Sequence, residues 1–224
     1  FLNNSGAEIN GAVTPTIEII GTSGRLLKAK KPFEVIPDRI EAGGFLVIGA
    51  LLGKNLKIKN CVPEHLSAFI SALKDAGVDL KIESDSIIVS RPKILKSTDI
   101  KTREYPGFPT DLQAPFVVLM TQAKGQSMVF ETVFDGRLNY IEDLNRMAAN
   151  IVMCDPHRIL VHGATKLRGR EIESPDLRAG LAFVIAALVA KGESLISNIY
   201  QIDRGYERID ERLKKLGAEI ERVE

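Results

Sequence analysis

Three apolar runs stand out along the chain, and each is followed by a turn glycine with a charged or amide neighbour. The runs cover residues 45–52, 116–120 and 181–188 and contain no polar stripe. A helix that is apolar on every side is expected to be buried on every side, and runs of this length are too short to cross a bilayer. We therefore expect three core helices that contact one another.

An Asp precedes each run. Asp38, Asp111 and Asp176 lie in the segments Pro-Asp-Arg-Ile-Glu-Ala-Gly, Thr-Asp-Leu-Gln-Ala-Pro and Pro-Asp-Leu-Arg-Ala-Gly. An Asp at this position is a favourable helix N-cap, because it accepts the free amides of the first turn and faces the positive end of the helix dipole. The chain therefore reads as three copies of one unit. The copies are longer than the roughly 20 to 50 residues of solenoid repeats, which favours a closed threefold domain.

The landmarks after each core helix recur in the same order. A strand follows the glycine turn, then an amphipathic helix, then a closure of small residues that leads into another strand. We expect the first strands at 56–60, 128–132 and 195–198, the second helices around 66–73, 141–147 and 209–216, and the closing strands at 78–82, 151–153 and 220–223, with additional strands at 86–90 and 158–162. The expected fold class is α/β (α+β), with units of approximately 38–100, 101–170 and 171–224.

Composition and charge narrow the function classes. The 224 residues are 45% hydrophobic and 26% charged, which is ordinary for a globular protein. Thirty basic and 29 acidic residues leave a net charge of +1, which argues against a protein that coats a polyanion, although a local basic cluster remains possible. We expect no nucleic-acid or membrane partner. The pattern contains no signal peptide or transmembrane run.

The two cysteines and three histidines suggest no chemistry of their own. Cys61 and Cys154 are far apart and lack the paired spacing of a zinc site or a disulfide framework, so we interpret both as structural residues of a protein in a reducing compartment. His65, His157 and His162 share no spacing. We expect no metal site.

The two ends of the chain are expected to belong to a larger protein. Residues 1–9 resemble the end of a second helix with its Gly-Ala closure and the strand that follows, and a strand is expected at 16–20. Residues 1–37 are therefore predicted to be the tail of a preceding domain, and the N-terminal half to be missing. The third unit stops one strand short of the other two, and we expect the missing strand to come from the absent beginning of the protein.

Anion binding is predicted independently of any resemblance. Three buried helices that begin at equivalent places direct their N-termini at one end of the domain, where free amides and dipole ends attract anions. Arg39 and Arg178 lie beside two of the caps, and Arg137 and Arg204 lie in loops expected to reach the same end. Arginine pairs with phosphate and carboxylate groups in a bidentate way. A phosphorylated carboxylic acid and a nucleotide diphosphate are ligands that such an end could hold.

Five ordered motifs carry a resemblance to a known family. They are Pro-Asp-Arg-Ile-Glu at 37–41, Phe-Pro-Thr-Asp at 108–111, Glu-Thr-Val-Phe-Asp-Gly-Arg at 131–137, Asp-Leu-Arg-Ala at 176–179 and Ile-Asp-Arg-Gly-Tyr-Glu-Arg at 202–208. In this order and spacing, the chain resembles the UDP-N-acetylglucosamine enolpyruvyl transferases over essentially its whole length. The related enzymes that act on shikimate 3-phosphate share the fold, but they are not expected to show the second and fifth motifs.

The resemblance implies both a fold and an activity. The family fold is an inside-out α/β barrel of two similar domains, each of three βαβαββ units around buried helices, with the active site between the domains. Residues 1–37 would be the tail of the N-terminal domain and residues 38–224 the C-terminal domain, and the family takes one strand of that domain from the start of the chain. The family transfers the enolpyruvyl group of phosphoenolpyruvate to the 3-hydroxyl of UDP-N-acetylglucosamine and releases phosphate. This is the first committed step of peptidoglycan synthesis, in the cytoplasm, and it supports cell-wall biogenesis, cell shape and cell division without a cofactor.

The resemblance also implies roles for individual residues. Asp111 matches the acid that contacts the attacking sugar hydroxyl. Arg178 and Arg204 match contacts of phosphoenolpyruvate, with Arg204 counted among the catalytic residues, and Arg137 matches a further substrate contact. Val133 would offer backbone groups to the UDP-sugar, and Asp176 would bind substrate. A mobile loop with a Cys or Asp acid and a Lys-Asn pair would belong to the missing N-terminal half.

Alternatives remain open for several of these residues. Asp38, Asp111 and Asp176 could be helix caps and nothing more, and an arginine such as Arg39 is often a solvated surface charge. The chain could also be a ligand-binding or interaction module without turnover, and as a fragment it is expected to be inactive alone.

Overall fold

The computed structural model describes residues 1–12 and 14–223. Contacts between residues divide the chain into two compact units, Phe1–Pro37 and Asp38–Glu224. The assignment of the first unit to a preceding domain stays a prediction. Among the described residues, no helix has the length and apolar character needed to cross a membrane.

The N-terminal unit is a small hairpin structure. A 3-10 turn, η1 (Asn3–Ser5), ends at Gly6 in the left-handed conformation, and β1 (Glu8–Asn10) then pairs antiparallel with β2 (Glu18–Ile20). The second strand covers the C-terminal part of the predicted segment 16–20.

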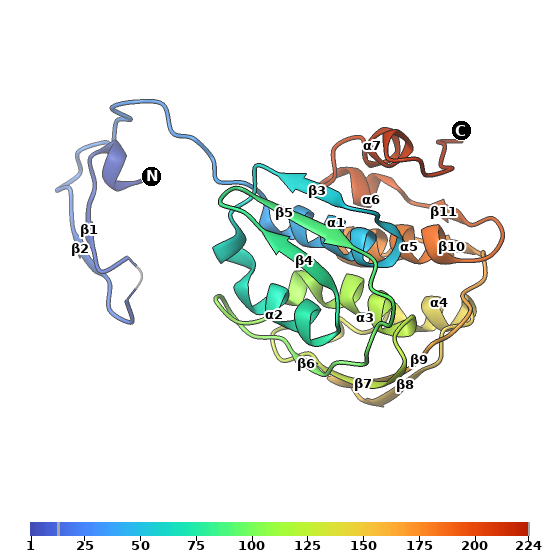
Figure 1. Cartoon of the computed structure of the whole chain (residues 1–224). Helices are drawn as coiled ribbons and strands as arrows, with labels where there is room; N and C mark the ends of the chain where they lie inside the picture. The colour runs from blue at the N-terminus through green and yellow to red at the C-terminus, as the bar shows by residue number, and fades with distance from the viewer. Residues whose placement is uncertain (13, 224) are drawn as a thin grey trace. The chain divides into compact units, whose positions relative to one another are not determined.

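Three helices form the centre of the second unit, as the apolar runs predict. They are α1 (Arg39–Leu52), α3 (Gln113–Thr121) and α5 (Leu177–Val189). All residues of α3 and most residues of α1 and α5 are buried. Figure 1 shows these helices enclosed by the sheets and the outer helices. Two adjacent glycines allow close approach, because a Cβ at Gly43 would overlap Leu112 and one at Gly44 would overlap Leu181.

Two of the three predicted caps are confirmed and one is wrong. Asp38 accepts the amides of Ile40 and Glu41, and Asp176 accepts those of Arg178 and Ala179. Asp111 caps nothing, because a 3-10 turn, η3 (Thr110–Leu112), precedes α3 and its N-cap is Pro109. Asp111 therefore lies inside the first turn, where its carboxylate is available to other partners.

Sheets surround the core helices in three groups. The first sheet has the order β3-β5-β4 and consists of β3 (Leu56–Lys59), β4 (Asp79–Ile82) and β5 (Ser86–Ser90). The second has the order β6-β7-β9-β8 and consists of β6 (Ile100–Lys101), β7 (Gly125–Phe130), β8 (Ile151–Asp155) and β9 (Arg158–Gly163). In the third, β10 (Glu171–Glu173) pairs parallel with β11 (Leu195–Ser197). The second group, with α3 and α4, forms a complete βαβαββ unit. The parallel strands β6 and β10 were not predicted from the sequence.

The second helices lie near their predicted places. They are α2 (Ser67–Asp75) with the preceding 3-10 turn η2 (Pro63–Leu66), α4 (Ile141–Arg146), and in the third unit α6 (Tyr200–Asp203) and α7 (Ile209–Lys215). Helices α2, α4 and α7 bury most of the apolar positions on which the prediction rested, among them Phe69, Leu144 and Leu213, but Leu216 at the end of α7 is 53% exposed. The short helix α6 was not predicted from the sequence.

The predicted strand at 220–223 is wrong. No strand lies beside this segment among the described residues, so its backbone has no ladder to join. Arg222 instead forms ion pairs with Asp203 at 2.6 Å and Asp210 at 3.0 Å, which hold the segment against α6 and α7. An alternating pattern alone does not make a strand where no partner strand is present.

Candidate functional site

Asp111 is the centre of an ion-pair cluster at the N-terminal end of the core helices. Arg137 Nη1 donates to Asp111 Oδ1 at 2.9 Å, and Arg178 Nη2 donates to Asp111 Oδ2 at 3.1 Å. The side chain of Asp111 is 29% exposed, that of Arg137 is 25% exposed and that of Arg178 is 24% exposed. They are thus shielded from bulk water on most sides and still accessible to a ligand.

Three parts of the chain supply these residues. Asp111 lies in η3, Arg137 in the loop after β7, and Arg178 in the first turn of α5. The close packing of η3 and α5 against α1 at Gly43 and Gly44 brings these segments together. The repeat of the sequence therefore places one residue from the third unit beside two from the second.

A buried carboxylate organises the floor of this cluster. Glu131 is fully buried and accepts four hydrogen bonds, from the Thr102 and Thr110 hydroxyls and from the Val133 and Phe134 amides. Thr110 Oγ1 in turn accepts from Arg137 Nη1 at 2.8 Å. Since hydrogen bonds to a charged group are stronger than neutral ones, Glu131 fixes both the loop that carries Arg137 and the turn that carries Asp111.

The Glu131 contact limits what Val133 can offer a ligand. Its amide already donates to Glu131 Oε1 at 2.8 Å. Of the two Val133 backbone groups predicted to contact a ligand, only the carbonyl is therefore available. The Arg137 guanidinium lies 4.5 Å from the ring centroid of Phe134 in the same loop, which stacks the charge on an exposed aromatic face.

Two buried tyrosines line the inner side of the cluster. Arg178 Nη1 donates to the Tyr206 hydroxyl at 3.4 Å, and the Tyr140 hydroxyl donates to Gln113 Oε1 at 3.1 Å. Burial raises the pKa of Tyr206 to about 12, and burial also raises the pKa of Tyr140. Both hydroxyls are therefore protonated at neutral pH. The Gln113 Nε2 donor is buried without a hydrogen-bond partner among the described residues.

The two arginines of the cluster could bind an anionic ligand. Both guanidinium groups pair directly with a single carboxylate, Asp111, whereas the Glu131 carboxylate is occupied by four hydrogen bonds and Asp176 caps the N-terminal end of α5. Arginine presents several donors, so an added phosphate or carboxylate could bind to those that Asp111 leaves free. The partial exclusion of water strengthens such contacts relative to contacts on an open surface.

The structure separates Arg204 and Asp176 from the ion pairs of this cluster. Arg204 is the C-cap of α6, is exposed, and donates to Gln201 Oε1 at 3.1 Å. Asp176 caps α5. Arg39 lies over the Tyr105 ring at 5.5 Å. The binding role of Arg204 stays a prediction, because no contact of the described chain brings it to Asp111.

Sequence reasoning missed several residues of the cluster. Glu131, Thr110, Tyr206 and Gln113 all lie within motifs singled out from the sequence, but their roles depend on burial. An acidic residue directly after an alternating strand ordinarily faces solvent. Only the pairing of β7 with β6 and β9, which covers Glu131, reveals it as a buried acceptor.

The cysteines and histidines lie elsewhere. Cys61 is buried, which raises the pKa of its thiol, and Cys154 is exposed. His157 Nε2 lies 3.5 Å from Asp135, and His162 contacts Gln126. Over residues 1–12 and 14–223, no group of three or more His, Cys, Asp or Glu side chains is arranged to hold a metal ion.

Comparison with known proteins places this fold, and with it the chain, in a family. Residues 1–213 match the family described as EPSP synthase (3-phosphoshikimate 1-carboxyvinyltransferase), and the chain belongs to this family. Carboxyvinyl and enolpyruvyl are names for the same group.

Individual relatives refine the comparison. The chain is 46% identical to the UDP-N-acetylglucosamine 1-carboxyvinyltransferase of Koribacter versatilis, over 100% of this chain and 51% of the relative. It is 43% identical to the enzyme of the same name from Thermodesulfovibrio yellowstonii, over 100% of this chain and 53% of the relative. The resemblance predicted from the five motifs is thus confirmed. The chain spans about half the length of these curated relatives.

Solved structures confirm the predicted fold class. The enolpyruvyl transferase NikO from Streptomyces tendae superposes with a TM-score of 0.90 at 25% identity, over 99% of this chain and 52% of that one. EPSP synthase from Acinetobacter baumannii gives a TM-score of 0.73 at 20% identity, over 100% of this chain and 54% of that one.

Proposed function

We propose that this chain carries one wall of the active site of an enzyme that transfers the enolpyruvyl group of phosphoenolpyruvate to the 3-hydroxyl of UDP-N-acetylglucosamine. The observation that supports the proposal most strongly is the double ion pair of Asp111 with Arg137 and Arg178. It unites a carboxylate suited to orient a hydroxyl with two cations suited to phosphate and carboxylate groups.

The proposed reaction is an addition followed by an elimination. The sugar hydroxyl adds to C2 of phosphoenolpyruvate while a proton is delivered to C3, and the tetrahedral intermediate then loses phosphate from C2 together with a proton from C3, which restores the double bond. Asp111 orients the hydroxyl or removes its proton, and Arg178 and Arg137 stabilise the carboxylate and the departing phosphate. For Asp111 to accept a substrate proton, a guanidinium must shift from the carboxylate to the incoming anion. Binding of phosphoenolpyruvate would therefore release Asp111 for catalysis.

UDP-N-acetylglucosamine is proposed as the acceptor because of the names of the relatives given above, and not because of the family's name. Relatives that are 43–46% identical bear the name of the UDP-N-acetylglucosamine enzyme, whereas the EPSP synthase structures are 20% identical. A shikimate 3-phosphate acceptor is the second candidate, because the matching family is named for it. The proposed setting of the reaction is the cytoplasm, at the first committed step of peptidoglycan synthesis.

The proposed partner of this chain is the N-terminal half of the same kind of enzyme. The side chains of the cluster are 24–29% exposed, and a second wall would exclude this water and supply the acid that protonates C3. We propose that the chain alone does not turn over, and that a role as a binding module without catalysis applies only in the absence of the other half.

A phosphate-release assay tests this function. The 224-residue chain is assayed alone and with a separately expressed N-terminal half from the Koribacter versatilis relative, with UDP-N-acetylglucosamine or shikimate 3-phosphate as acceptor. Release that requires both polypeptides and UDP-N-acetylglucosamine is expected. Release with shikimate 3-phosphate would favour the second candidate, and turnover by the chain alone would contradict the need for a second wall.

A further inference from the structure

A cluster of cations lies at the end of the domain opposite the candidate site. We define the basic face as the exposed residues Arg91, Lys93, Lys96, Lys124, Arg168 and Lys191. They follow the ends of strands or core helices in all three units. Backbone bridges join Lys96 to Lys124 and Arg168 to Lys191, and Arg91 donates its amide to Gly53, the C-cap of α1.

The cations of the basic face have no ionic partners within the described part of the chain. None of the six forms an ion pair or a side-chain hydrogen bond there. The simplest explanation is that these cations balance the negative dipole ends at the C-termini of α1, α3 and α5. Three helix ends contribute about −1.5 charges together, which six cations exceed several-fold. Helix capping therefore explains only part of the cluster.

The acids near this face are fewer than its cations. Asp75 directly precedes Ala76, whose carbonyl accepts the Lys96 amide. Asp79 opens β4 beside Ser90, and Glu193 follows the last turn glycine. Asp99 accepts the Met128 amide at 2.7 Å. The net charge of the whole chain, +1, thus conceals a separation of charge along its surface.

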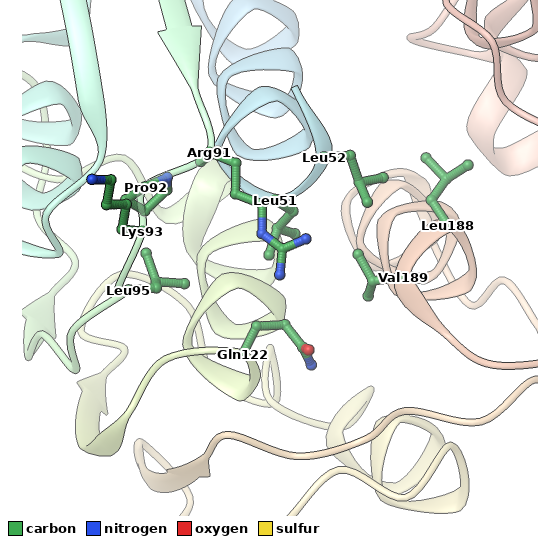
Figure 2. A pocket seen from close by; sticks show the side chains of 10 residues that line it. Leu51, Leu52, Arg91, Pro92, Lys93, Leu95, Gln122, Leu188 and Val189 are labelled. Carbon is green, nitrogen blue, oxygen red and sulfur yellow. The ribbon is translucent and has the colours of Figure 1, made fainter. Parts of the chain in front are cut away.

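Apolar side chains project among these cations. Ile94, between Lys93 and Leu95, is 65% exposed, and Leu52 at the end of α1 is 46% exposed. A recess of about 270 Å³ is lined by the ends of α1 and α5, which include Leu52, by Gln122, and by residues 91–93 and Leu95 on either side of Ile94. Figure 2 shows the Arg91 guanidinium near Leu51 and Gln122 inside this recess, with Leu52, Leu188 and Val189 on its other side.

We propose that the basic face docks on the surface of an anionic phospholipid bilayer. Clusters of four to eight Lys and Arg residues bind anionic headgroups, with about 1 kcal/mol for each cation near the surface, and aliphatic side chains among them enter the boundary between headgroups and acyl chains. Ile94 and Leu52 supply that apolar part. The contact is peripheral and needs no spanning helix.

The composition of the basic face favours a bilayer over nucleic acid. Single-stranded nucleic acids are bound by aromatic side chains on which bases stack, and neither the six cations nor the lining of the recess includes an aromatic residue. Exposed aliphatic residues gain nothing from a phosphate backbone in water. An anionic bilayer, in contrast, offers favourable contacts to the cations and to the aliphatic residues alike.

Docking at this face would leave the candidate site accessible. The core helices run from the Asp111 cluster to the basic face, and α5 has 13 residues, so the two ends are about 20 Å apart. Arg137 and Arg178 would face away from the lipid. Substrates could therefore enter from water while the domain is bound to the membrane.

Vesicle sedimentation tests this proposal on the 224-residue chain. Vesicles of phosphatidylcholine alone are compared with vesicles of phosphatidylcholine and phosphatidylglycerol in equal parts, at low salt. We expect binding to the anionic vesicles only, reversed at high salt because the Debye length falls to about 3 Å at 1 M. The triple variant Lys93→Gln, Lys96→Gln, Lys124→Gln should bind about a hundredfold more weakly, or about fivefold for each charge.

A matched variant separates the basic face from net charge. The exposed lysines Lys59, Lys81 and Lys101 lie on strands outside the face, and their triple replacement by Gln changes the net charge equally. This control should keep most of the vesicle binding, and thermal melts should show that both variants fold. Equal losses in the two variants, or no binding to anionic vesicles at low salt, would overturn the proposal. Retention of a single-stranded RNA probe together with absent vesicle binding would also overturn it.

Discussion

Replacement of Glu131 by Gln isolates the contribution of the buried carboxylate. The change preserves shape and leaves one oxygen to accept from Thr102, Val133 and Phe134, but it converts the acceptor of the Thr110 hydroxyl into an amide donor. A hydrogen bond to a charged group contributes about 1.5–3 kcal/mol. We therefore expect a loss of about 2 kcal/mol in the free energy of unfolding, equivalent to a fall of about 4–8 °C in Tm for a domain of this size.

Differential scanning calorimetry measures this loss, and Glu104→Gln is the matched control. Glu104 is exposed and its side chain forms no ion pair or hydrogen bond among residues 1–12 and 14–223, so its variant carries the same charge change and should melt within about 1 °C of the parent. If Glu131→Gln melted like the control, the four hydrogen bonds would not organise the loop. A gain in stability would mean that desolvation of the buried charge outweighs its hydrogen bonds.

Three further changes test the core, the tyrosine hydroxyls and the arginines. Phe183→Asp places an unpaired charge in the dry centre of α5 at a cost of several kcal/mol, and it should abolish the cooperative melt; a melt like that of the parent would refute the central-helix assignment. The pKa of Tyr206 is raised from 10.0 to about 12, so the folded state holds this proton more tightly than the unfolded state. Its stabilising effect is present below pH 10 and is lost between pH 10 and 12, by at most about 3 kcal/mol. Melts of Tyr206→Phe should decline less over that range, and an identical decline in parent and variant would contradict the raised pKa. Arg178→Lys cannot reach both Asp111 and Tyr206, and in the reconstituted enzyme it should raise the KM for phosphoenolpyruvate about 10- to 100-fold; an unchanged KM would exclude Arg178 from substrate binding.

Much of the core was predictable because burial and helical periodicity leave a strong pattern. The apolar runs around Phe45, Phe116 and Phe183 identify the three central helices, and the Asp before the first and third runs identifies their caps. The same rule fails at Asp111, because Pro109 begins a 3-10 turn that moves the carboxylate inside the helix start. A two-residue shift of the N-cap, from Asp111 to Pro109, leaves Asp111 free to be the centre of the ion pairs.

Other features depend on neighbours that local sequence does not specify. The strands β6 and β10 have two and three residues, too few for a periodic signal, and exist because parallel partners lie beside them. Residues 220–223 have a strand pattern but no partner. Glu131 looks like a surface residue until the sheet closes over it, and the position of Arg204 depends on a short helix that its motif does not predict.

The catalytic assignment of Asp111 is the central claim, and turnover measures it directly. UDP-N-acetylglucosamine-dependent phosphate release is compared for the parent chain, Asp111→Ala and the exposed control Asp79→Ala, each mixed with the N-terminal half of the Koribacter versatilis relative. Asp111→Ala should lower kcat by roughly two to four orders of magnitude while its melt stays cooperative, and Asp79→Ala should retain the parent rate. A change of less than about fivefold for Asp111→Ala, far below the range for a positioned acid-base group, would contradict the assignment.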